Sequence, residues 1–234
     1  WYYYLNAAKE KNIPILLSSA LFRSKQIFFK WYGGLYNKML SLFTHIMVQD
    51  EASYQLVTRE LKIKNVSITG DTRFDRVIEN VKAAKQIDWI NLLSNHKNII
   101  AGSTWEEDEK IISKTTAHFT QFNWIIVPHQ VDVKSIRDCK NRFHNAITLS
   151  SLLDNPVAQT KPIVLIVDCI GLLRTLYQYS FVSYVGGGFG SDGVHNVLEP
   201  AAFGKPVIWG HNDAKYQEAI GLRNFGGGFK IQNE

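Results

Sequence analysis

Two neighbouring segments combine glycines with polar side chains that suit a nucleotide ligand. The first is the run VGGGFGSDG at residues 185–193, which follows an apolar stretch and precedes a segment with helical spacing. Glycine permits positive φ and close backbone approach, and the free N–H groups of a helix start attract phosphate. The run lacks the GxGxxG spacing of a dinucleotide site and the lysine of a P-loop. Taken alone, it is equally well interpreted as a flexible turn.

The second segment follows at once and carries His195, Asn196 and Glu199. In a helix over residues 194–203, His195 and Glu199 would lie on one face, because positions i and i+4 are neighbours. A carboxylate there can accept two hydrogen bonds from ribose hydroxyls. A solvated first-turn Glu stabilised by the helix dipole is the plainer alternative.

A strand predicted over residues 98–101 leads through Gly-Ser-Thr into a helix predicted over residues 106–119. Ser103 or Thr104 is expected to be the N-cap of that helix, with a glutamate completing a capping box. An anion at the same helix start is compatible with this structural role.

Two more strand ends place a basic side chain where a ligand can meet it. Pro128 and His129 follow the strand predicted over residues 124–127, although a lone histidine is more often structural than catalytic. Arg73 faces the cleft if a helix starts at Thr72, but an interdomain ion pair is the stronger interpretation.

All these residues follow short apolar runs, which alternate with helical spacing along the chain. The alternation predicts βα units that build parallel sheets, with ligands at the carboxyl ends of the strands. Predicted strands cover residues 13–17, 45–48, 66–69, 98–101, 124–127, 146–148, 163–167, 181–185, 206–209 and 228–231. Predicted helices cover residues 31–43, 50–61, 74–85, 106–119, 133–143, 171–179, 194–203 and 215–223.

The expected fold class is therefore α/β, with two Rossmann-like domains of which the first is incomplete. Residues 1–81 are predicted to be the C-terminal part of the first domain and residues 98–234 most of the second. The polar, weakly patterned residues 82–97 are predicted to connect them. Because the chain starts at Trp1 and stops after a strand-like run, we expect it to be the interior of a longer protein.

Composition excludes several classes of protein. The 234 residues are 45% hydrophobic, and the net charge of +5 suits an anionic ligand without indicating nucleic acid, which is not an expected partner. The longest apolar stretch, residues 13–22, is shorter than the ~20 residues of a membrane-spanning helix. Two cysteines are too few for a disulfide framework. The sequence has no HExxH and no GxSxG motif, so it gives no support for a metal site or a serine nucleophile. No cofactor is expected.

Taken in chain order, these segments resemble the 3-deoxy-D-manno-octulosonic acid (Kdo) transferases of lipopolysaccharide synthesis. The family motifs G-N-x-K-F-D, G-S-T-H-x-G-E and P-R-H correspond to GDTRFD at 70–75, GSTWEE at 102–107 and PHQ at 128–130. The motif D-x-x-G-E-L corresponds to DCIGLL at 168–173. The strongest match is GVHNVLEP at 193–200, which corresponds to G-G-H-N-x-L-E-P.

The resemblance implies a GT-B glycosyltransferase that moves Kdo from CMP-Kdo to the lipid A precursor, lipid IVA, with inversion and without a metal. It implies a Gram-negative cell and a location at the cytoplasmic face of the inner membrane, peripheral or held by a preceding segment. The implied donor-binding residues are Ser103, Thr104, Pro128, His129, Gly187, Gly188, His195, Asn196 and Glu199, with Arg73 at the interdomain cleft. Glu199 would hold the ribose hydroxyls. The catalytic base, a Glu, is expected upstream of Trp1, so no catalytic residue is expected within the chain.

Three departures from the family pattern limit these implications. The Arg of P-R-H is His129, which removes a permanent charge and makes donor binding more sensitive to pH. The Lys of K-F-D is Arg73, and the Glu of G-E-L is Leu172, so any role of that carboxylate is lost.

The basic, aromatic stretch at residues 25–40 has two interpretations. It suits a membrane surface, with Lys25, Lys30 and Lys38 near anionic headgroups, and it also suits an ordinary core-facing helix. Two alternatives also remain for the function. One is a GT-B enzyme that uses a UDP-sugar, such as a transferase or a UDP-GlcNAc 2-epimerase, and the other is a non-catalytic nucleotide-binding or scaffold domain.

Overall fold

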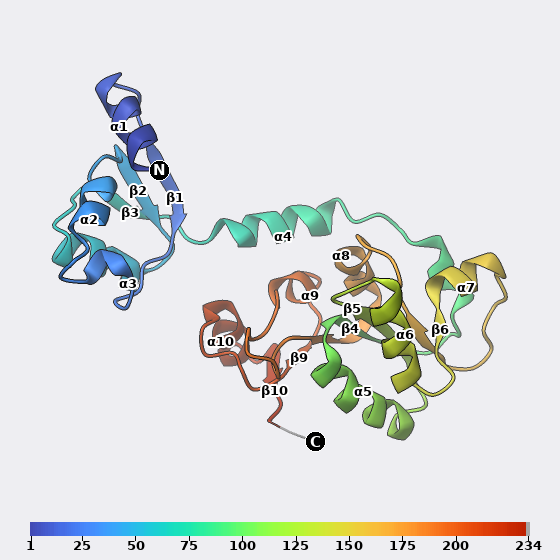
Figure 1. Ribbon diagram of the computed structural model, residues 1–234. Helices are drawn as coiled ribbons and strands as arrows, with labels where there is room; N and C mark the ends of the chain where they lie inside the picture. The colour runs from blue at the N-terminus through green and yellow to red at the C-terminus, as the bar shows by residue number, and fades with distance from the viewer. Residues whose placement is uncertain (233–234) are drawn as a thin grey trace. The chain divides into compact units, whose positions relative to one another are not determined.

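The computed structural model describes residues 1–232 and divides the chain into two compact units, Trp1–Arg76 and Val77–Glu234. The boundary falls inside helix α4 (Thr72–Lys82) (Figure 1). The predicted connection, residues 82–97, contributes Ile87 and Leu93 to the core of the second unit. Within residues 1–232, no helix combines the length and the apolar character needed to cross a membrane.

The first unit is built on a small parallel sheet with the strand order β1-β2-β3 (Figure 1). Its strands are β1 (Leu16–Ala20), β2 (His45–Val48) and β3 (Val66–Ile68). Its helices are α1 (Tyr2–Glu10), the 3-10 turn η1 (Ile27–Phe29), α2 (Gly34–Leu40), α3 (Glu51–Gln55) and the π-helical turn η2 (Leu56–Glu60). Ile46 and Val48 of the central strand are fully buried in its core.

Two predictions for this unit need correction. The first strand starts at Leu16 rather than at residue 13, because Pro14 has no N–H to give to a ladder. The helix predicted over residues 31–43 is only α2, and Trp31 before it is 95% exposed. Asp50 is the N-cap of α3 and accepts a hydrogen bond from the Ser53 N–H at 2.7 Å.

The second unit contains a seven-stranded sheet whose order is β10-β9-β8-β4-β5-β7-β6, with every pair parallel. The strands are β4 (Asn98–Thr104), β5 (Asn123–Pro128), β6 (Ile147–Thr148), β7 (Val164–Ile166), β8 (Ser180–Val185), β9 (Val207–Trp209) and β10 (Gly228–Lys230). The helices are η3 (Asp88–Leu92), α5 (Glu106–His118), α6 (Val133–Arg142), α7 (Leu149–Asp154), α8 (Leu173–Leu176), η4 (Tyr177–Tyr179), α9 (Leu198–Ala202) and α10 (Gln217–Asn224). The predicted α/β class with parallel sheets is confirmed.

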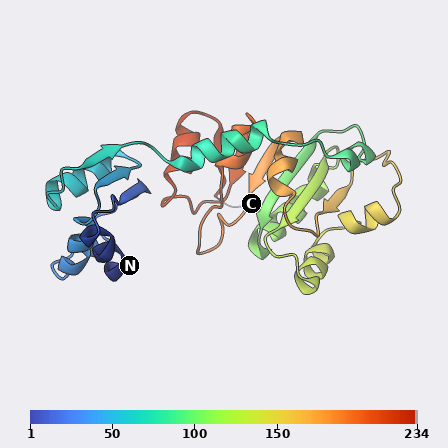
Figure 2. The same ribbon diagram turned by 90° about the horizontal axis from the view of Figure 1, so that it is seen from above.

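Alternation along the central strands divides the apolar side chains between two faces. Ile100 and Ile125 belong to one core with residues of η3, α7 and α8, whereas Ala101 and Ile126 belong to another with residues of α5 and α6. Successive side chains of a strand point to opposite faces, so fully apolar strands require cover on both sides. Helices accordingly flank the sheet on both faces, as Figure 2 shows from above.

The strand order reverses direction at β4. From β4 the chain passes to β5 and the β6–β7 edge, and then returns to add β8, β9 and β10 on the other side. In such sheets the crevice between the two directions, at the carboxyl ends of the strands, is where ligands bind. Here that crevice lies between the ends of β4 and β8.

Candidate functional site

The end of β4 carries a β-bulge at Ser103. The register between β4 and β5 shifts between Gly102 and Thr104, and Ser103 adopts a left-handed φ of 54°. The Gly186 N–H donates to the Gly102 carbonyl at 2.9 Å, and a Cβ on Gly186 would lie 2.2 Å from the Ser103 carbonyl oxygen. Because no side chain fits at position 186, the glycine run begins as a close backbone contact with the bulge.

The rest of the glycine run is held in place by the backbone. Gly187 has a φ of 88°, and its N–H donates to a carboxylate oxygen of Asp108 at 2.9 Å. A Cβ on Gly188 would lie 2.5 Å from the Gly210 nitrogen, and the Asn212 N–H donates to the Gly188 carbonyl at 2.8 Å. The run is therefore a fixed loop, and the Gly187 N–H is already engaged within the protein.

Asp108 is a central residue of the site that sequence reasoning missed. It is 1% exposed and accepts hydrogen bonds from the Trp105 N–H, the Gly187 N–H and the Tyr184 hydroxyl at 2.9, 2.9 and 2.6 Å. Burial and the adjacent carboxylate raise the pKa of Tyr184, which keeps that hydroxyl a donor. A signal was available, since an acidic residue three positions after a helix start closes its first turn.

The predicted N-cap of α5 is wrong. Trp105 occupies that position, and neither Ser103 nor Thr104 does. Thr104 is 2% exposed and donates its hydroxyl to Glu109 at 3.2 Å. Burial raises the pKa of Glu109 despite the hydrogen bond from Arg142 at 2.7 Å. The Thr104 hydroxyl thus donates to a carboxylate of α5 that is itself bound by Arg142 of α6.

Three aromatic rings gather where β4, β5 and the glycine run end. The indole N–H of Trp105 donates to Nε2 of His195 at 2.9 Å. His129 stacks on both: its ring centroid lies 4.3 Å from that of Trp105 and 4.8 Å from that of His195. We call Trp105, His129 and His195 the ring cluster. It unites two of the predicted donor-site residues with one that the sequence analysis did not select.

The environment of the ring cluster favours a neutral His195. Burial, followed by the neighbouring His129, lowers the pKa of His195, against the opposite pull of Asp108 and Asp192. His129 is exposed at the end of β5, and its backbone N–H donates to the Thr104 carbonyl at 2.9 Å. Pro128, the last residue of β5, is buried and pairs with Thr104 across the ladder.

The remaining predicted residues lie around α9. The helix begins at Leu198, so the expectation that His195 and Glu199 share a helix face is wrong. Pro200 has no N–H to give to the Asn196 carbonyl, so the helix does not extend further toward its N-terminus. The Asn196 side chain instead accepts a hydrogen bond from the Leu198 N–H at 3.1 Å, as an Asx turn before the helix. Glu199 is 3.9 Å from the Arg174 guanidinium.

Glu199 is also close to the floor of the crevice. Burial, with the nearby charge of Glu199, raises the pKa of Tyr177. The Tyr177 hydroxyl in turn occupies the space where a Cβ on Gly102 would lie, at 2.1 Å. Glu199, Tyr177 and Gly102 therefore form one neighbourhood at the end of β4, within reach of the switch point.

Arg73 belongs to the first unit, near the start of α4. Its guanidinium pairs with Asp71 at 2.6 Å, and its backbone N–H donates to the same carboxylate at 2.9 Å. These contacts hold the turn between β3 and α4. A role for Arg73 in an interdomain cleft stays a prediction.

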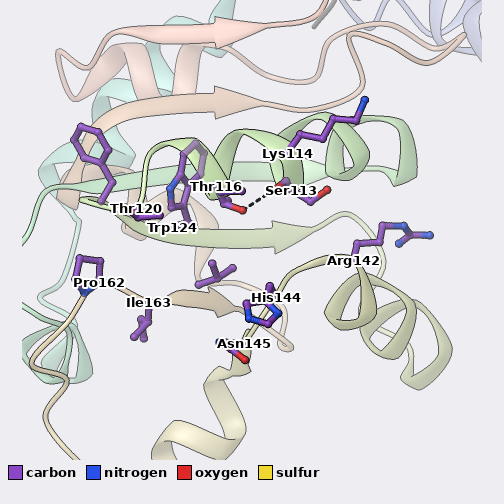
Figure 3. Close-up of a pocket in the computed structure, with 13 residues that line it drawn as sticks. Ser113, Lys114, Thr116, Thr120, Trp124, Arg142, His144, Asn145, Pro162 and Ile163 are labelled. Atoms are coloured by element: carbon purple, nitrogen blue, oxygen red, sulfur yellow. Dashed lines mark hydrogen bonds between the residues drawn. The ribbon is translucent and has the colours of Figure 1, made fainter.

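A separate hollow of about 640 Å³ lies at the opposite edge of the sheet, at the amino ends of β5 and β7 (Figure 3). Trp124 of β5 and Ile163, just before β7, line it, as do Arg142 at the end of α6 and His144 just after that helix. The predicted donor-site residues do not line it. Among residues 1–232, no three His, Cys, Asp or Glu side chains gather in a way that would hold a metal ion.

Comparisons with known proteins show which sequences the chain resembles. Residues 1–76 match the family model described as 3-deoxy-D-manno-octulosonic-acid transferase (kdotransferase). Over its whole length the chain is 26% identical to a bifunctional glycosyltransferase/methyltransferase of Fusobacterium nucleatum, of which it covers 37%. Over 89% of its length it is 29% identical to a 3-deoxy-D-manno-octulosonic acid transferase of Rickettsia bellii, of which it covers 50%. The chain thus spans half or less of the length of these relatives.

Two solved structures show the fold. The C-terminal CMP-Kdo binding domain of WaaA from Acinetobacter baumannii matches 68% of this chain and 83% of that domain, with a TM-score of 0.53 and 22% identity. A UDP-GlcNAc 2-epimerase from Neisseria meningitidis matches 98% of this chain and 60% of its own, with a TM-score of 0.63 and 17% identity. Both likenesses support a GT-B-type arrangement of parallel α/β sheets.

Proposed function

We propose, from its motifs and from the match of residues 1–76 to the family model, that this chain is a Kdo transferase that binds CMP-Kdo and serves the transfer of Kdo to a lipid A precursor. The observation that carries the proposal is that residues at family-motif positions of the second unit gather at the switch-point crevice. His129 follows β5, whereas His195 and Glu199 both follow the glycine run after β8. The two histidine rings stack, and Glu199 lies near Tyr177 at the end of β4.

The crevice offers chemistry that suits a sugar nucleotide. Glu199 supplies a carboxylate for the ribose hydroxyls, while the ring cluster supplies flat faces and imidazole nitrogens for the anionic part of the donor. The Gly187 N–H is engaged by Asp108, so we assign the loop the role of shaping the crevice. We propose transfer with inversion and without a metal, as the family resemblance implies.

The choice of nucleotide tests the proposal directly. Titration calorimetry of the 234-residue chain with CMP and with UDP, at equal ionic strength, should give clearly tighter binding of CMP. Tighter binding of UDP would favour a UDP-sugar enzyme, in keeping with the epimerase-like fold, and would refute the proposed donor. Binding of neither nucleotide would refute a donor site in this chain.

The role of Glu199 is tested by Glu199→Ala. In the protein expressed from its complete gene, we expect Kdo transfer to become undetectable while the circular dichroism spectrum stays unchanged. Asp154→Ala is the matched control, because Asp154 is an exposed carboxylate at the end of α7 beside the far edge strand. Wild-type turnover in the Glu199 variant would refute the ribose role.

A membrane surface is the second part of the proposal, at the cytoplasmic face of the inner membrane, where the lipid acceptor is available. Residues 1–76 contain eleven Lys and Arg against six Asp and Glu. Trp1, Tyr3, Tyr4 and Trp31 are each at least 79% exposed. Lys38 of α2 lies 5.8 Å from the ring of Tyr2 in α1, so at this point a lysine lies over an aromatic ring.

Exposed aromatic rings beside lysines are typical of surfaces that meet anionic lipid headgroups. The chain should therefore sediment with vesicles that contain anionic lipid at low salt, and much less at high salt or with neutral vesicles. Equal sedimentation with neutral and anionic vesicles, or none with either, would refute this surface.

A further inference from the structure

We propose that Trp105 is a positioning residue for anion binding: its indole keeps His195 neutral and leaves His129 as the ring that takes up a proton when an anionic ligand binds. The proposal rests on the proposed donor site, which it deepens. It concerns a position where the family motif has His and this chain has Trp.

The geometry of the ring cluster carries the argument. Trp105 and His195 are nearly coplanar, at 13°, with centroids 6.4 Å apart and a 2.9 Å N–H···N hydrogen bond between their edges. They form one layer. His129 lies 4.3 and 4.8 Å from their centroids, tilted by 22° and 17°, so its ring covers the seam between them.

The hydrogen bond fixes the charge of His195. An indole N–H only donates, so Nε2 of His195 has to accept and cannot carry a proton of its own. The proton of the neutral ring is then on Nδ1. Charging His195 would break this bond and place a second cation against His129 in a half-buried position.

His129 is free of that restraint. It is exposed, and it lies on the face of an indole, which attracts a cation. The carboxylates next to the cluster are Asp108 of α5 and Asp192 of the glycine loop, whereas Glu106 at the start of α5 pairs with Lys110 and Arg142. In this acidic setting an incoming anion needs a partner cation, and protonated His129 provides it.

The measurable consequence is that one proton is taken up for each anion bound. The probe is the methyl ester of CMP, because its phosphodiester keeps one negative charge where the phosphate of CMP itself titrates near pH ~6. Its association constant should fall as the pH is raised from 6 to 8, because one proton has to be taken up for each ester bound. His129→Arg should bind the ester as strongly at pH 8 as at lower pH, because its guanidinium stays charged, so the pH dependence should disappear. His118→Gln, at an exposed histidine of α5, is the control that should retain it.

Trp105→Phe separates positioning from simple packing. It keeps an aromatic ring but removes the N–H, so His195 becomes able to protonate and the proton uptake should rise from one toward two. Nitrogen-detected NMR of the ligand-free histidines provides an independent measure. Wild-type His195 should be the neutral Nδ1–H form at pH 6, and in the variant it should titrate.

The outcomes distinguish this inference from the proposed function. If the ester does not bind, the donor assignment and the proton uptake on His129 both fail. The His195 tautomer and its change in Trp105→Phe then still show whether the indole holds His195 neutral. If the ester binds with the same pH dependence in wild type, His129→Arg and Trp105→Phe, the positioning role is overturned. A protonated His195 in wild type at pH 6 would overturn it as well.

Discussion

The two units carry their polar groups in opposite ways. The first holds the whole net charge of the chain, eleven basic against six acidic residues, and exposes aromatic rings beside its lysines. The second is balanced, with fifteen of each, and buries three of its carboxylates. Asp108, Glu109 and Asp213 are each at most 4% exposed and hydrogen-bonded, Asp213 to Trp209, Arg223 and Lys230.

The difference separates two kinds of recognition. Exposed charge acts through a long-range field and tolerates changes in geometry, but salt screens it. Buried, fully paired carboxylates fix the backbone around a site and are costly to disturb. Substitutions in the second unit should therefore change stability and the crevice together, whereas those in the first should change surface binding with little effect on stability.

The largest effect is expected at Asp108. Asp108→Ala leaves the Trp105 and Gly187 N–H groups and the Tyr184 hydroxyl without their acceptor, which should lower the free energy of unfolding by roughly 3–5 kcal/mol. Urea unfolding followed by tryptophan fluorescence measures this. Asp138→Ala, which removes only a surface pair with Arg137, should stay within about 0.5 kcal/mol. A loss below 1 kcal/mol at Asp108 would contradict the contrast between the units.

Next comes the charge of the first unit. Replacing exposed Lys25, Lys30 and Lys38 by Gln should weaken binding to anionic vesicles roughly hundredfold, at about 1 kcal/mol for each lysine near the surface. The matched triple variant in the second unit, at exposed Lys134, Lys140 and Lys161, should bind almost as the wild type does. Equal losses in both variants would mean that the charge asymmetry has no directional role.

A smaller effect is expected where the glycine loop crosses the loop after β9. Gly188→Ala places a Cβ 2.5 Å from the Gly210 nitrogen, and relief of this overlap should cost about 2 kcal/mol. Gly190→Ala is the control within the same loop, because its nearest neighbour would be 3.5 Å away. Thermal unfolding of both variants measures the difference. Equal melting temperatures would show that the backbone contact between the two loops can adjust at little cost in stability.

The smallest effect lies in the first unit, at the cap of α3. Burial raises the pKa of Asp50, but hydrogen bonds from Ser53 and the charge of Arg23 outweigh it, so the pKa in the folded protein is lowered. The stabilisation that ionised Asp50 gives to the folded protein is present above the pKa of Asp50 in the unfolded chain. It is lost as the pH falls through the lower pKa of the folded protein. Asp50→Ala should cost about 1 kcal/mol at pH 7 and less in acid. Asp50→Asn should keep most of the cap without that pH dependence. If the free energy of unfolding fell in acid by the same amount in Asp50→Asn as in the wild type, the pH dependence would not come from Asp50.

Much of the fold can be predicted from residue type, because strands buried on both faces need continuous apolar runs such as residues 99–101 and 124–127. Helix limits are harder to predict. Helix α9 begins three residues after His195, since Asn196 turns the chain through its side chain first. Helix α1 was not predicted, because its aromatic residues follow no clear helical period.

The site was predictable only in part, for a related reason. His129 and His195 stood out as ligand-like residues at strand ends, and the structure stacks them. Trp105 and Asp108 did not stand out, because a tryptophan is usually a packing residue and a first-turn acid is usually solvated. Their roles depend on the bulge at Ser103 and on contacts to residues about 80–90 positions away.

The crossing of Gly188 and Gly210 has a consequence for how such a site can diverge. The contact joins backbone to backbone, so no side chain has to be matched to another across it. The rings above the crossing can then be exchanged for other residues without dismantling the loop beneath them. A scaffold of this kind lets the side chains of the crevice change while its backbone keeps the same shape.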